Sequence, residues 1–445
     1  MINRWLFTQI DNSALIIFRV FFGFLIAAEG IGAILTGWVG RTLVEPKFTF
    51  NFIGLDFLQP LPGNGMYFYF AIMGSLGLLV MVGYKYRWSM IGYTLMWAGV
   101  YFMQKSSYNN HYYLLLLLCI IMSILPAGNY FSIDVKKNPA LKRIAMPRWC
   151  LLIIIAQLWI VYTYASVAKL YPDWLDFTVA KNLMSGKADL PIIGELLQEH
   201  WAHVSIAYFG ILFDLLIVPL LLWKRTRLFA FGVSIFFHLF NSAVFQIGIF
   251  PYMSLAFSVF FFSKETIHRL FMKKKEFYDK KEIIVSDYKK IALPIAIIWF
   301  VIQIALPVRH WFIPGDVLWT EEGHKLSWRM MLRGRSGSTN FYVVNKDDPD
   351  ARRSYIKKSD YLTKKQLRMV SARPDGIWQF AQYLKKEYAA RGTDIAVYVD
   401  SRVSVNGKPY KQLIDPKVDL TSVPWNHFTT NPWVIKYSDD QQSSE

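Results

Sequence analysis

The chain has 445 residues, of which 54% are hydrophobic and 17% are aromatic, and its formal net charge is +17. This composition is too apolar for an ordinary soluble protein and is typical of a membrane protein with a water-soluble part. The charge does not indicate nucleic acid as a partner, because Lys and Arg gather in short segments between apolar runs, as the positive-inside rule describes. Cys119 and Cys150 fall in or beside such runs, so we expect neither a disulfide nor a cysteine-bound metal.

The apolar runs predict a polytopic α-helical membrane bundle of about nine spans. They lie at residues 14–36, 65–83, 88–103, 111–126, 149–168, 203–223, 228–245, 249–263 and 291–307. If consecutive spans alternate in direction, the four basic loops between them and the N-terminus all face the cytoplasm. The segments 37–64, 104–110, 169–202 and 246–248 and the C-terminal part then lie on the opposite side of the membrane.

The composition changes after Pro307, where charged residues and strand and turn signals become frequent. The stretches KLSWRMML and TNFYVV predict strands with a turn at RGRSG between them, and Asp375–Ala390 has the pattern of a helix. IAVYVDSRVSV is followed by Asn406 and Gly407, which is a β-hairpin signal. We therefore predict a membrane domain over residues 1–307, a soluble extracytoplasmic α+β domain over 308–436, and a disordered tail over 437–445.

Lys169 stands just after the charge-free run Trp149–Ala168. In one interpretation it is an interfacial anchor whose side chain reaches the lipid headgroups. In the other it lies in a partly dry pocket, where burial disfavours its charged form. A neutral amine of this kind can act as a general base near neutral pH.

The stretch KSSYNNHYY precedes the fourth run and contains Asn109, Asn110 and His111. Two amides and an imidazole can hydrogen-bond a polar ligand, and the imidazole can exchange a proton near neutral pH. The alternative, which the local sequence favours, is that Asn109 or Asn110 caps a helix that begins near His111.

His238 and Asn241 are spaced i, i+3 in the seventh run and therefore share one face of a helix. Both polar groups are too costly to leave facing lipid. They either satisfy each other or nearby backbone inside the bundle, or they face a ligand. In the alternating arrangement of spans, His111, Lys169 and Asn241 all lie toward the outer face, and convergent polar groups mark binding sites.

Several catalytic classes are excluded by the absence of their motifs from the sequence. There is no P-loop, no G-x-S-x-G, no dinucleotide fingerprint and no zinc spacing. Any chemistry would therefore rely on amine, imidazole, amide and phenol groups, with a cofactor supplied from outside the chain.

Three motifs of the membrane part resemble the vitamin K-dependent γ-glutamyl carboxylase family, whose membrane part is an HTTM domain. They are YNNHYYLLLLL (108–118), YASVAKLYPDWL (164–175) and FHLFNSAVFQIGIFPY (237–252). The resemblance continues in PGDVLWTEEGHKLSWRMML (314–332), YVDSRVSV and IDPKVDL (414–420), so it covers roughly residues 20–430. It implies an enzyme that deprotonates vitamin K hydroquinone, oxygenates it with dioxygen to the epoxide, and uses the resulting base to carboxylate a peptide glutamate with carbon dioxide.

The resemblance also implies the residues and partners of this reaction. A lysine matching Lys169 is the base, and a histidine matching His111 takes part in the hydroquinone chemistry. No metal is required, and the implied partners are a glutamate-containing peptide or protein and membrane lipids. The residues expected to bind quinone or substrate in these motifs are Asn109, Asn110, Tyr164, His238 and Asn241. From the sequence itself, the basic residues Arg329 and Arg333 near the junction of the two parts are expected to attract an acidic substrate, with a solvated basic face as the favoured alternative.

The chain also departs from the characterised animal members of this family. Those proteins are longer, and they join their two parts by a disulfide that Cys119 and Cys150 are not placed to form. The outer segments contain no N-x-[ST] sequon, which favours a multi-pass protein of a bacterial inner membrane. The alternatives are a quinone epoxidase without carboxylation and a non-catalytic membrane protein that binds lipid or quinone. A binding protein has no need of a base, and the repeats typical of transporters are absent.

Overall fold

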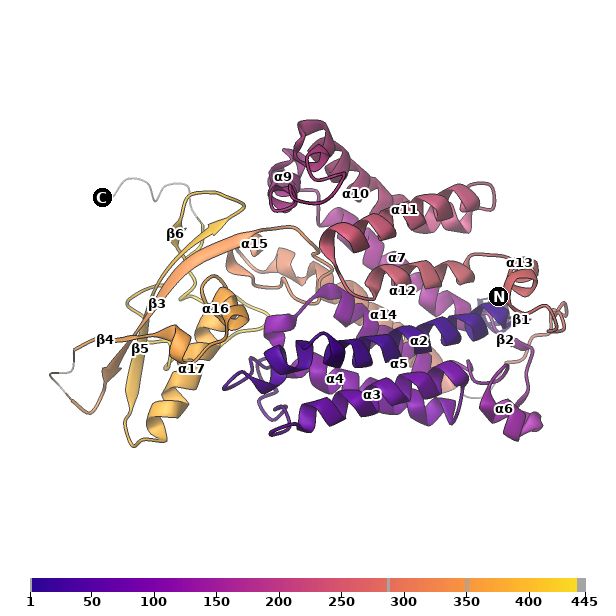
Figure 1. Ribbon diagram of the computed structural model, residues 1–445, viewed down its shortest axis with the longest axis horizontal. Coiled ribbons are helices and arrows are strands. Elements are labelled where there is room, and N and C mark those ends of the chain that lie inside the picture. Colours follow the sequence, from indigo (N-terminus) through magenta and orange to yellow (C-terminus); the bar gives the residue numbers. More distant parts are fainter. Residues whose placement is uncertain (1, 286–288, 349, 351, 438–445) are drawn as a thin grey trace.

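The computed structural model describes residues 2–285, 289–348, 350 and 352–437. Figure 1 shows a bundle of long helices, a sheet with its own helices at one end of the bundle, and the N-terminus at the opposite end. The bundle consists of α2 (Ser13–Leu35), α3 (Gly65–Val82), α4 (Tyr86–Met103), α5 (Asn110–Ile124), α7 (Trp149–Val167), α10 (His200–Leu222), α11 (Arg227–Phe245), α12 (Phe250–Ala256) with η5 (Phe257–Phe260), and α14 (Lys289–Val308).

Short elements connect these helices. They are α1 (Ile2–Leu6), β1 (Gln9–Asp11), η1 (Gly40–Val44), η2 (Lys105–Ser107), α6 (Ile133–Lys137), η3 (Pro139–Leu141), β2 (Ala145–Pro147), α8 (Pro172–Leu175), α9 (Thr178–Ser185), η4 (Leu196–Gln198) and α13 (Lys264–Phe271). β1 and β2 form an antiparallel pair at the N-terminal end of the bundle.

Every predicted span coincides with a helical segment, but the number nine is not confirmed. Among the described residues, six helices are long and apolar enough to cross a membrane: α2, α3, α7, α10, α11 and the one that runs from Lys289 to Phe312. α5 has 15 residues and α12 with η5 is shorter still, so at about 1.5 Å per residue neither matches a hydrocarbon layer of about 30 Å. α4 has 18 residues, but Arg87 and several hydroxyl groups make it less apolar.

Small residues let α2 and α3 pack closely along their length. A Cβ atom added at Gly23 would lie 2.3 Å from the backbone nitrogen of Met81, and one added at Gly77 would lie 2.6 Å from that of Ala27. Helices in lipid associate through such close backbone contact. Larger side chains at these two glycines would force the helices apart.

The C-terminal part is built on an antiparallel sheet with the strand order β4-β3-β5-β6. β3 and β5 pair over their full length, and α17 packs on the sheet, where Phe380 meets Phe341 edge to face at 4.8 Å. The elements are η6 (Arg309–Phe312), α15 (Val317–Thr320), β3 (Arg335–Asn345), β4 (Ser354–Ile356), η7 (Lys358–Asp360), α16 (Lys364–Val370), α17 (Pro374–Ala389), β5 (Ile395–Val405) and β6 (Lys411–Gln412).

The helix predicted near residue 375 and the hairpin after β5 are both confirmed. Asn406 and Gly407 have φ values of 53° and 81°, and a type I′ hairpin turn needs positive φ at both positions. The predicted tail over residues 437–445 lies outside the described residues, except for Tyr437.

The prediction of a strand at KLSWRMML and a turn at RGRSG is wrong. Residues 325–332 are irregular, because Leu326, Trp328 and Met331 have positive φ, and β3 already begins at Arg335 inside the expected turn. Trp328 is buried and stacks on Tyr113 of α5 with ring centroids 4.8 Å apart. This segment therefore follows the surface of the bundle instead of joining the sheet.

The C-terminal part is attached to loops at one end of the bundle through buried polar contacts. Lys105 in η2 and Lys325 both pair with Asp375 at the start of α17, at 2.5 and 2.6 Å. Burial raises the pKa of Asp375, but the two lysines outweigh it and hold that pKa well below its usual range. Burial also lowers the pKa of Lys105 to about 8.

Contacts from two further loops of the bundle reach the same domain. Gln379 donates to the backbone oxygen of Asn51 at 2.9 Å, and Asn406 donates to Asp173 at 2.9 Å. The segments 37–64, 104–110 and 169–202, which we predicted to lie on one side with the C-terminal part, therefore all touch it.

Candidate active site

Lys169 points into the protein, so it is not an interfacial anchor. It follows the end of α7, it is 7% exposed, and its Nζ lies 2.5 Å from Oδ2 of Asp214 and 3.0 Å from the carbonyl oxygen of Ala165. Asp214 belongs to α10 and is also 7% exposed. The indole ring of Trp174 lies 5.5 Å from the same Nζ, and an aromatic face attracts a cation.

Asp214 changes what Lys169 can be expected to do. Burial alone disfavours the ammonium form, but a carboxylate at hydrogen-bond distance favours it. We predicted a neutral amine from burial alone. That prediction did not include Asp214, whose carboxylate favours the charged form of the amine. The signal was present, because Asp214 is the one charged residue of the apolar run 203–223, and an ionisable residue within a span marks a functional or paired group.

A cavity of about 690 Å³ lies beside Lys169, between the end of α7 and the segment that enters the C-terminal part. Ala168 and Leu170 line it on either side of Lys169, whose own side chain turns toward Asp214. The walls are mainly apolar and aromatic. The remaining lining includes Tyr164, Tyr171, Pro172, Asp173, Pro307, His310, Trp311, Ile313, Asp316, Leu318, Trp319, Ser327, Arg329, Lys408 and Tyr437.

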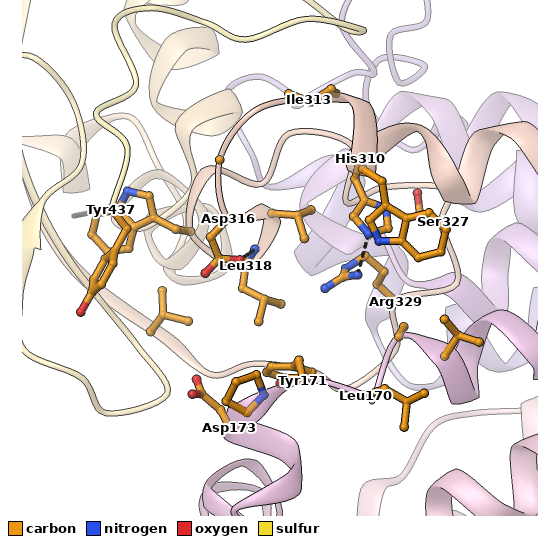
Figure 2. A pocket seen from close by; sticks show the side chains of 18 of the residues that line it. Leu170, Tyr171, Asp173, His310, Ile313, Asp316, Leu318, Ser327, Arg329 and Tyr437 are labelled. Atoms are coloured by element: carbon orange, nitrogen blue, oxygen red, sulfur yellow. Dashed lines mark hydrogen bonds between the residues drawn. The ribbon is translucent and has the colours of Figure 1, made fainter. Parts of the chain in front are cut away.

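Arg329 supplies a buried positive charge to this cavity. Figure 2 shows its side chain beside His310 and above Tyr171, and its Nη1 donates to Nε2 of His310 at 3.1 Å, while Nδ1 of His310 lies 2.7 Å from the carbonyl oxygen of Pro307. Nε of Arg329 is buried without a hydrogen-bond partner. Burial lowers the pKa of Arg329 to about 10, which still leaves the guanidinium charged at neutral pH.

Arg333 does not line the same cavity as Arg329. Its Nε donates to Oε1 of Glu321 at 2.5 Å, and its Nη1 lies 2.8 Å from Nε2 of His324. Burial raises the pKa of Glu321, but Arg333, His324 and Arg335 outweigh burial and hold that pKa well below its usual range. The two arginines that we grouped from the sequence therefore belong to different surroundings.

Arg333 instead lines a smaller cavity of about 270 Å³ between the C-terminal part and the loop of the bundle that contains η2. Its walls are strongly basic, and its lining is Ser106, Arg333, Arg335, Lys365, Arg368, Met369, Ala372 and Arg373. Such a surface suits an acidic ligand that arrives from water.

His111 and His238 come together around one aromatic ring in the bundle. The ring of His111 stacks on Phe250 of α12 at 3.9 Å between centroids, and the ring of His238 meets Phe250 edge-on at 6.1 Å. Nε2 of His238 lies 3.3 Å from the hydroxyl of Tyr162 on α7. The possibility that His238 and Asn241 satisfy each other is therefore wrong, because Nε2 of His238 faces the hydroxyl from α7 and Nδ1 is buried without a hydrogen-bond partner.

The helices α7 and α10 connect the histidine group with the Lys169–Asp214 pair. Tyr162 precedes Lys169 by two helical turns on α7, and Phe213, the chain neighbour of Asp214, packs against His238 at 5.6 Å. His238 is therefore linked to the Lys169–Asp214 pair through residues of α7 and α10, whereas His111 joins this group through Phe250 of α12.

Three of the remaining predicted site residues have hydrogen-bond partners within the protein. Asn109 is the N-cap of α5 and accepts a hydrogen bond from the backbone N–H of Tyr112 at 2.7 Å, which confirms the capping interpretation. Asn110 donates to the backbone oxygen of Arg329 at 3.1 Å, and Tyr164 donates to that of Ile304 at 3.0 Å. Tyr164 lines the larger cavity, whereas Asn241 is half-buried near the end of α11.

The chain matches two family models over most of its length. The HTTM domain model matches residues 7–265, and the model described as vitamin K-dependent gamma-carboxylase, lumenal domain, matches residues 288–440. No solved structure matches the chain.

Proposed function

The chain belongs to the vitamin K-dependent gamma-carboxylase family, and we propose that it converts vitamin K hydroquinone to the epoxide while it carboxylates a peptide glutamate to γ-carboxyglutamate. The reaction consumes dioxygen and carbon dioxide. One observation carries the proposal: a buried lysine paired with a buried aspartate lies directly beside a cavity between the membrane helices and the C-terminal domain, and both chain neighbours of the lysine line that cavity.

The cavity residues fit a reduced naphthoquinone. Leu170, Tyr171 and Trp311 offer apolar and aromatic surface to a two-ring molecule. The unpartnered Nε of Arg329 can donate to a quinone oxygen. When bound, the hydroquinone and dioxygen together supply a base strong enough to remove a γ-proton from glutamate.

Lys169 and Asp214 hold the proton that this chemistry must move. Transfer of one proton from Nζ to Oδ2, across 2.5 Å, gives a neutral amine and a carboxylic acid. The neutral form avoids two buried charges, each of which is costly away from water. The free amine can then accept the proton of a hydroquinone hydroxyl, and movement of Lys169 from Asp214 toward the cavity brings it within reach.

The two substrates bind at different places in the chain. An apolar quinone enters the cavity from the bilayer, whereas a glutamate-bearing peptide arrives from water and meets the basic surface around Arg333. We propose that the C-terminal domain lies outside the cytoplasm of a bacterial inner membrane, since the basic loops of the bundle mark the opposite side.

The test uses the full chain with vitamin K hydroquinone, dioxygen, bicarbonate and a glutamate peptide. Mass spectrometry of both products should detect the quinone epoxide and γ-carboxyglutamate with the unaltered chain and neither with Lys169→Ala. Lys181→Ala is the matched control, because Lys181 is an exposed lysine of the same outer segment and its loss should change neither product. A small exogenous amine should restore part of the activity of Lys169→Ala.

Two other outcomes favour the alternatives. Epoxide without γ-carboxyglutamate would indicate a quinone epoxidase. Neither product from the unaltered chain would indicate a non-catalytic lipid- or quinone-binding protein, in which the Lys169–Asp214 pair is structural. The observation that favours this last function is that the side chain of Lys169 does not line the cavity.

A further inference from the structure

A second large groove lies at the end of the bundle opposite the C-terminal domain, near α6 and the N-terminus (Figure 1). It measures about 610 Å³ and is formed by the first half of α2, the end of α3 and the segment that leads into α6. Its lining is Arg19, Val20, Met81, Val82, Tyr130, Phe131, Ser132, Ile133, Val135, Lys136 and Lys142. None of these residues takes part in the proposed reaction.

Three cations and no carboxylate occur among the described residues that line this groove. Arg19 is fully buried, and its guanidinium donates to the backbone oxygens of Ala127, Tyr130 and Phe131 at 3.0, 3.1 and 2.5 Å. Carbonyl groups satisfy N–H donors but carry no net charge, so they leave the positive charge in place. Nε of Arg19 is buried and has no hydrogen-bond partner.

One acidic residue, Asp134, lies close to this charge, and its hydrogen bonds to neutral backbone N–H groups leave its negative charge in place. Both carboxylate oxygens of Asp134 accept backbone N–H groups at the start of α4, from Lys85 at 2.7 Å and from Tyr86 at 2.8 Å. Lys136 and Lys142 are exposed at the rim of the groove, where their ammonium groups add to the positive field. Three cations against this one carboxylate leave the site with a surplus of positive charge that suits an anion.

The walls show that the anion must also carry apolar chains. Val20, Met81, Val82, Ile133 and Val135 form a largely apolar face. This face lies where two membrane helices, α2 and α3, reach the surface of the bundle. A soluble phosphate would satisfy the cations but leave the apolar wall in water.

We propose that this groove binds one anionic phospholipid of the adjacent leaflet. Its phosphate lies near Arg19, Lys136 and Lys142, and an acyl chain runs along the apolar wall. Phospholipid headgroups lie at this level of a membrane, and basic residues there attract anionic lipids. The inference concerns the opposite end of the bundle from the cavity at Lys169 and does not depend on the proposed function.

The experiment measures lipid binding by native mass spectrometry of the full chain in a neutral detergent. Phosphatidylglycerol is titrated against phosphatidylcholine of the same acyl chains. The unaltered chain should retain one phosphatidylglycerol in preference to phosphatidylcholine. Lys136→Ser combined with Lys142→Ser should weaken that binding by about 30-fold, roughly a factor of five for each cation near the lipid phosphate.

Lys273→Ser combined with Lys274→Ser is the matched control, since both are exposed lysines of another basic loop and neither lines the groove. It should leave the affinity unchanged. Val82→Trp, which fills the apolar wall without changing charge, should also release the lipid.

Four results would overturn the proposal, of which three concern the lipids and the variants. They are equal binding of the two lipids, an equal loss in the control variant, and retention of the lipid by Val82→Trp. Displacement of the lipid by glycerol phosphate at a similar concentration would also overturn it, because the site would then recognise a soluble phosphate.

Discussion

Replacement of Lys169 by arginine tests whether this lysine acts as a base or only as a structural cation. The guanidinium of Lys169→Arg can still pair with Asp214, the buried carboxylate 2.5 Å from Nζ in the unaltered chain, and it can lie against the face of Trp174. An arginine is not deprotonated in proteins, so the variant retains the charge of the pair and loses the ability to accept a proton.

The expected magnitudes differ for stability and for activity. Breaking a buried ion pair costs about 3–5 kcal/mol, because one charge remains without its partner. Lys169→Met should therefore reduce the free energy of unfolding by up to this amount, although protonation of Asp214 limits the loss. Lys169→Arg should cost about 1–3 kcal/mol, the usual cost of a somewhat larger side chain in a packed site. Epoxide formation should fall by about 10²–10⁴ in both variants, the usual contribution of a positioned acid–base group.

The assay pairs thermal unfolding in detergent with quinone epoxide yield. Asp214→Leu combined with Lys169→Met completes the comparison, because it removes both charges and should be more stable than either single change. Full epoxide yield from Lys169→Arg would refute the base and leave the lysine as a structural cation. Strictly additive losses in the double variant would refute the ion pair itself.

Three further predictions concern the histidines, the arginines and the topology. His111→Ala should lower epoxide yield by about 10²–10⁴. His238→Ala should mainly lower the unfolding temperature, because it removes the hydrogen-bond partner of a buried hydroxyl. The opposite pattern in activity and unfolding measurements would show that His238 takes part in the chemistry and that His111 is structural. Arg333→Gln should raise the KM for the peptide by about 10- to 100-fold, which is the usual contribution of a charge-assisted hydrogen bond, and it should leave epoxide formation unchanged. Arg329→Gln should lower the yield of both products. Equal effects of the two variants in peptide titrations would show that the two arginines do not have distinct roles. Reporter fusions at Lys280 and at the C-terminal end should report opposite sides of the membrane, and the same side at both would end the alternating arrangement.

The sequence was most informative where one physical rule dominates. Apolar runs located every long helix of the bundle, because backbone groups in lipid must be satisfied within a helix. The Asn406-Gly407 turn and the Asn109 cap were also predictable, since each depends on the local backbone alone. The number of spans was not, because α5 and α12 resemble spans in apolarity and differ from them in length.

Long-range partners account for what the sequence did not reveal. Lys169 and Asp214 are 45 residues apart, and the local pattern around the lysine contains no sign of its carboxylate. Arg329 and Arg333 are four residues apart, yet the irregular backbone between Trp328 and Met331 sends them to different cavities. Backbone of this kind has no sequence period, so the expectation of a strand there failed and the grouping of the two arginines failed with it.

The larger cavity exists only because the two parts of the chain are held together. One wall comes from the end of α7 and the residues after it, and the other from residues 307–319 and from Arg329. On one side of this junction, Asp173 accepts a hydrogen bond from Asn406 at 2.9 Å and pairs with Lys408 at 2.8 Å. On another side, Asp375 forms ion pairs with Lys105 and Lys325. Because these contacts are largely buried, neither wall can shift without leaving a charge unpaired, which is costly. A lysine base beside an apolar cavity thus depends on ion pairs that lie outside the cavity itself.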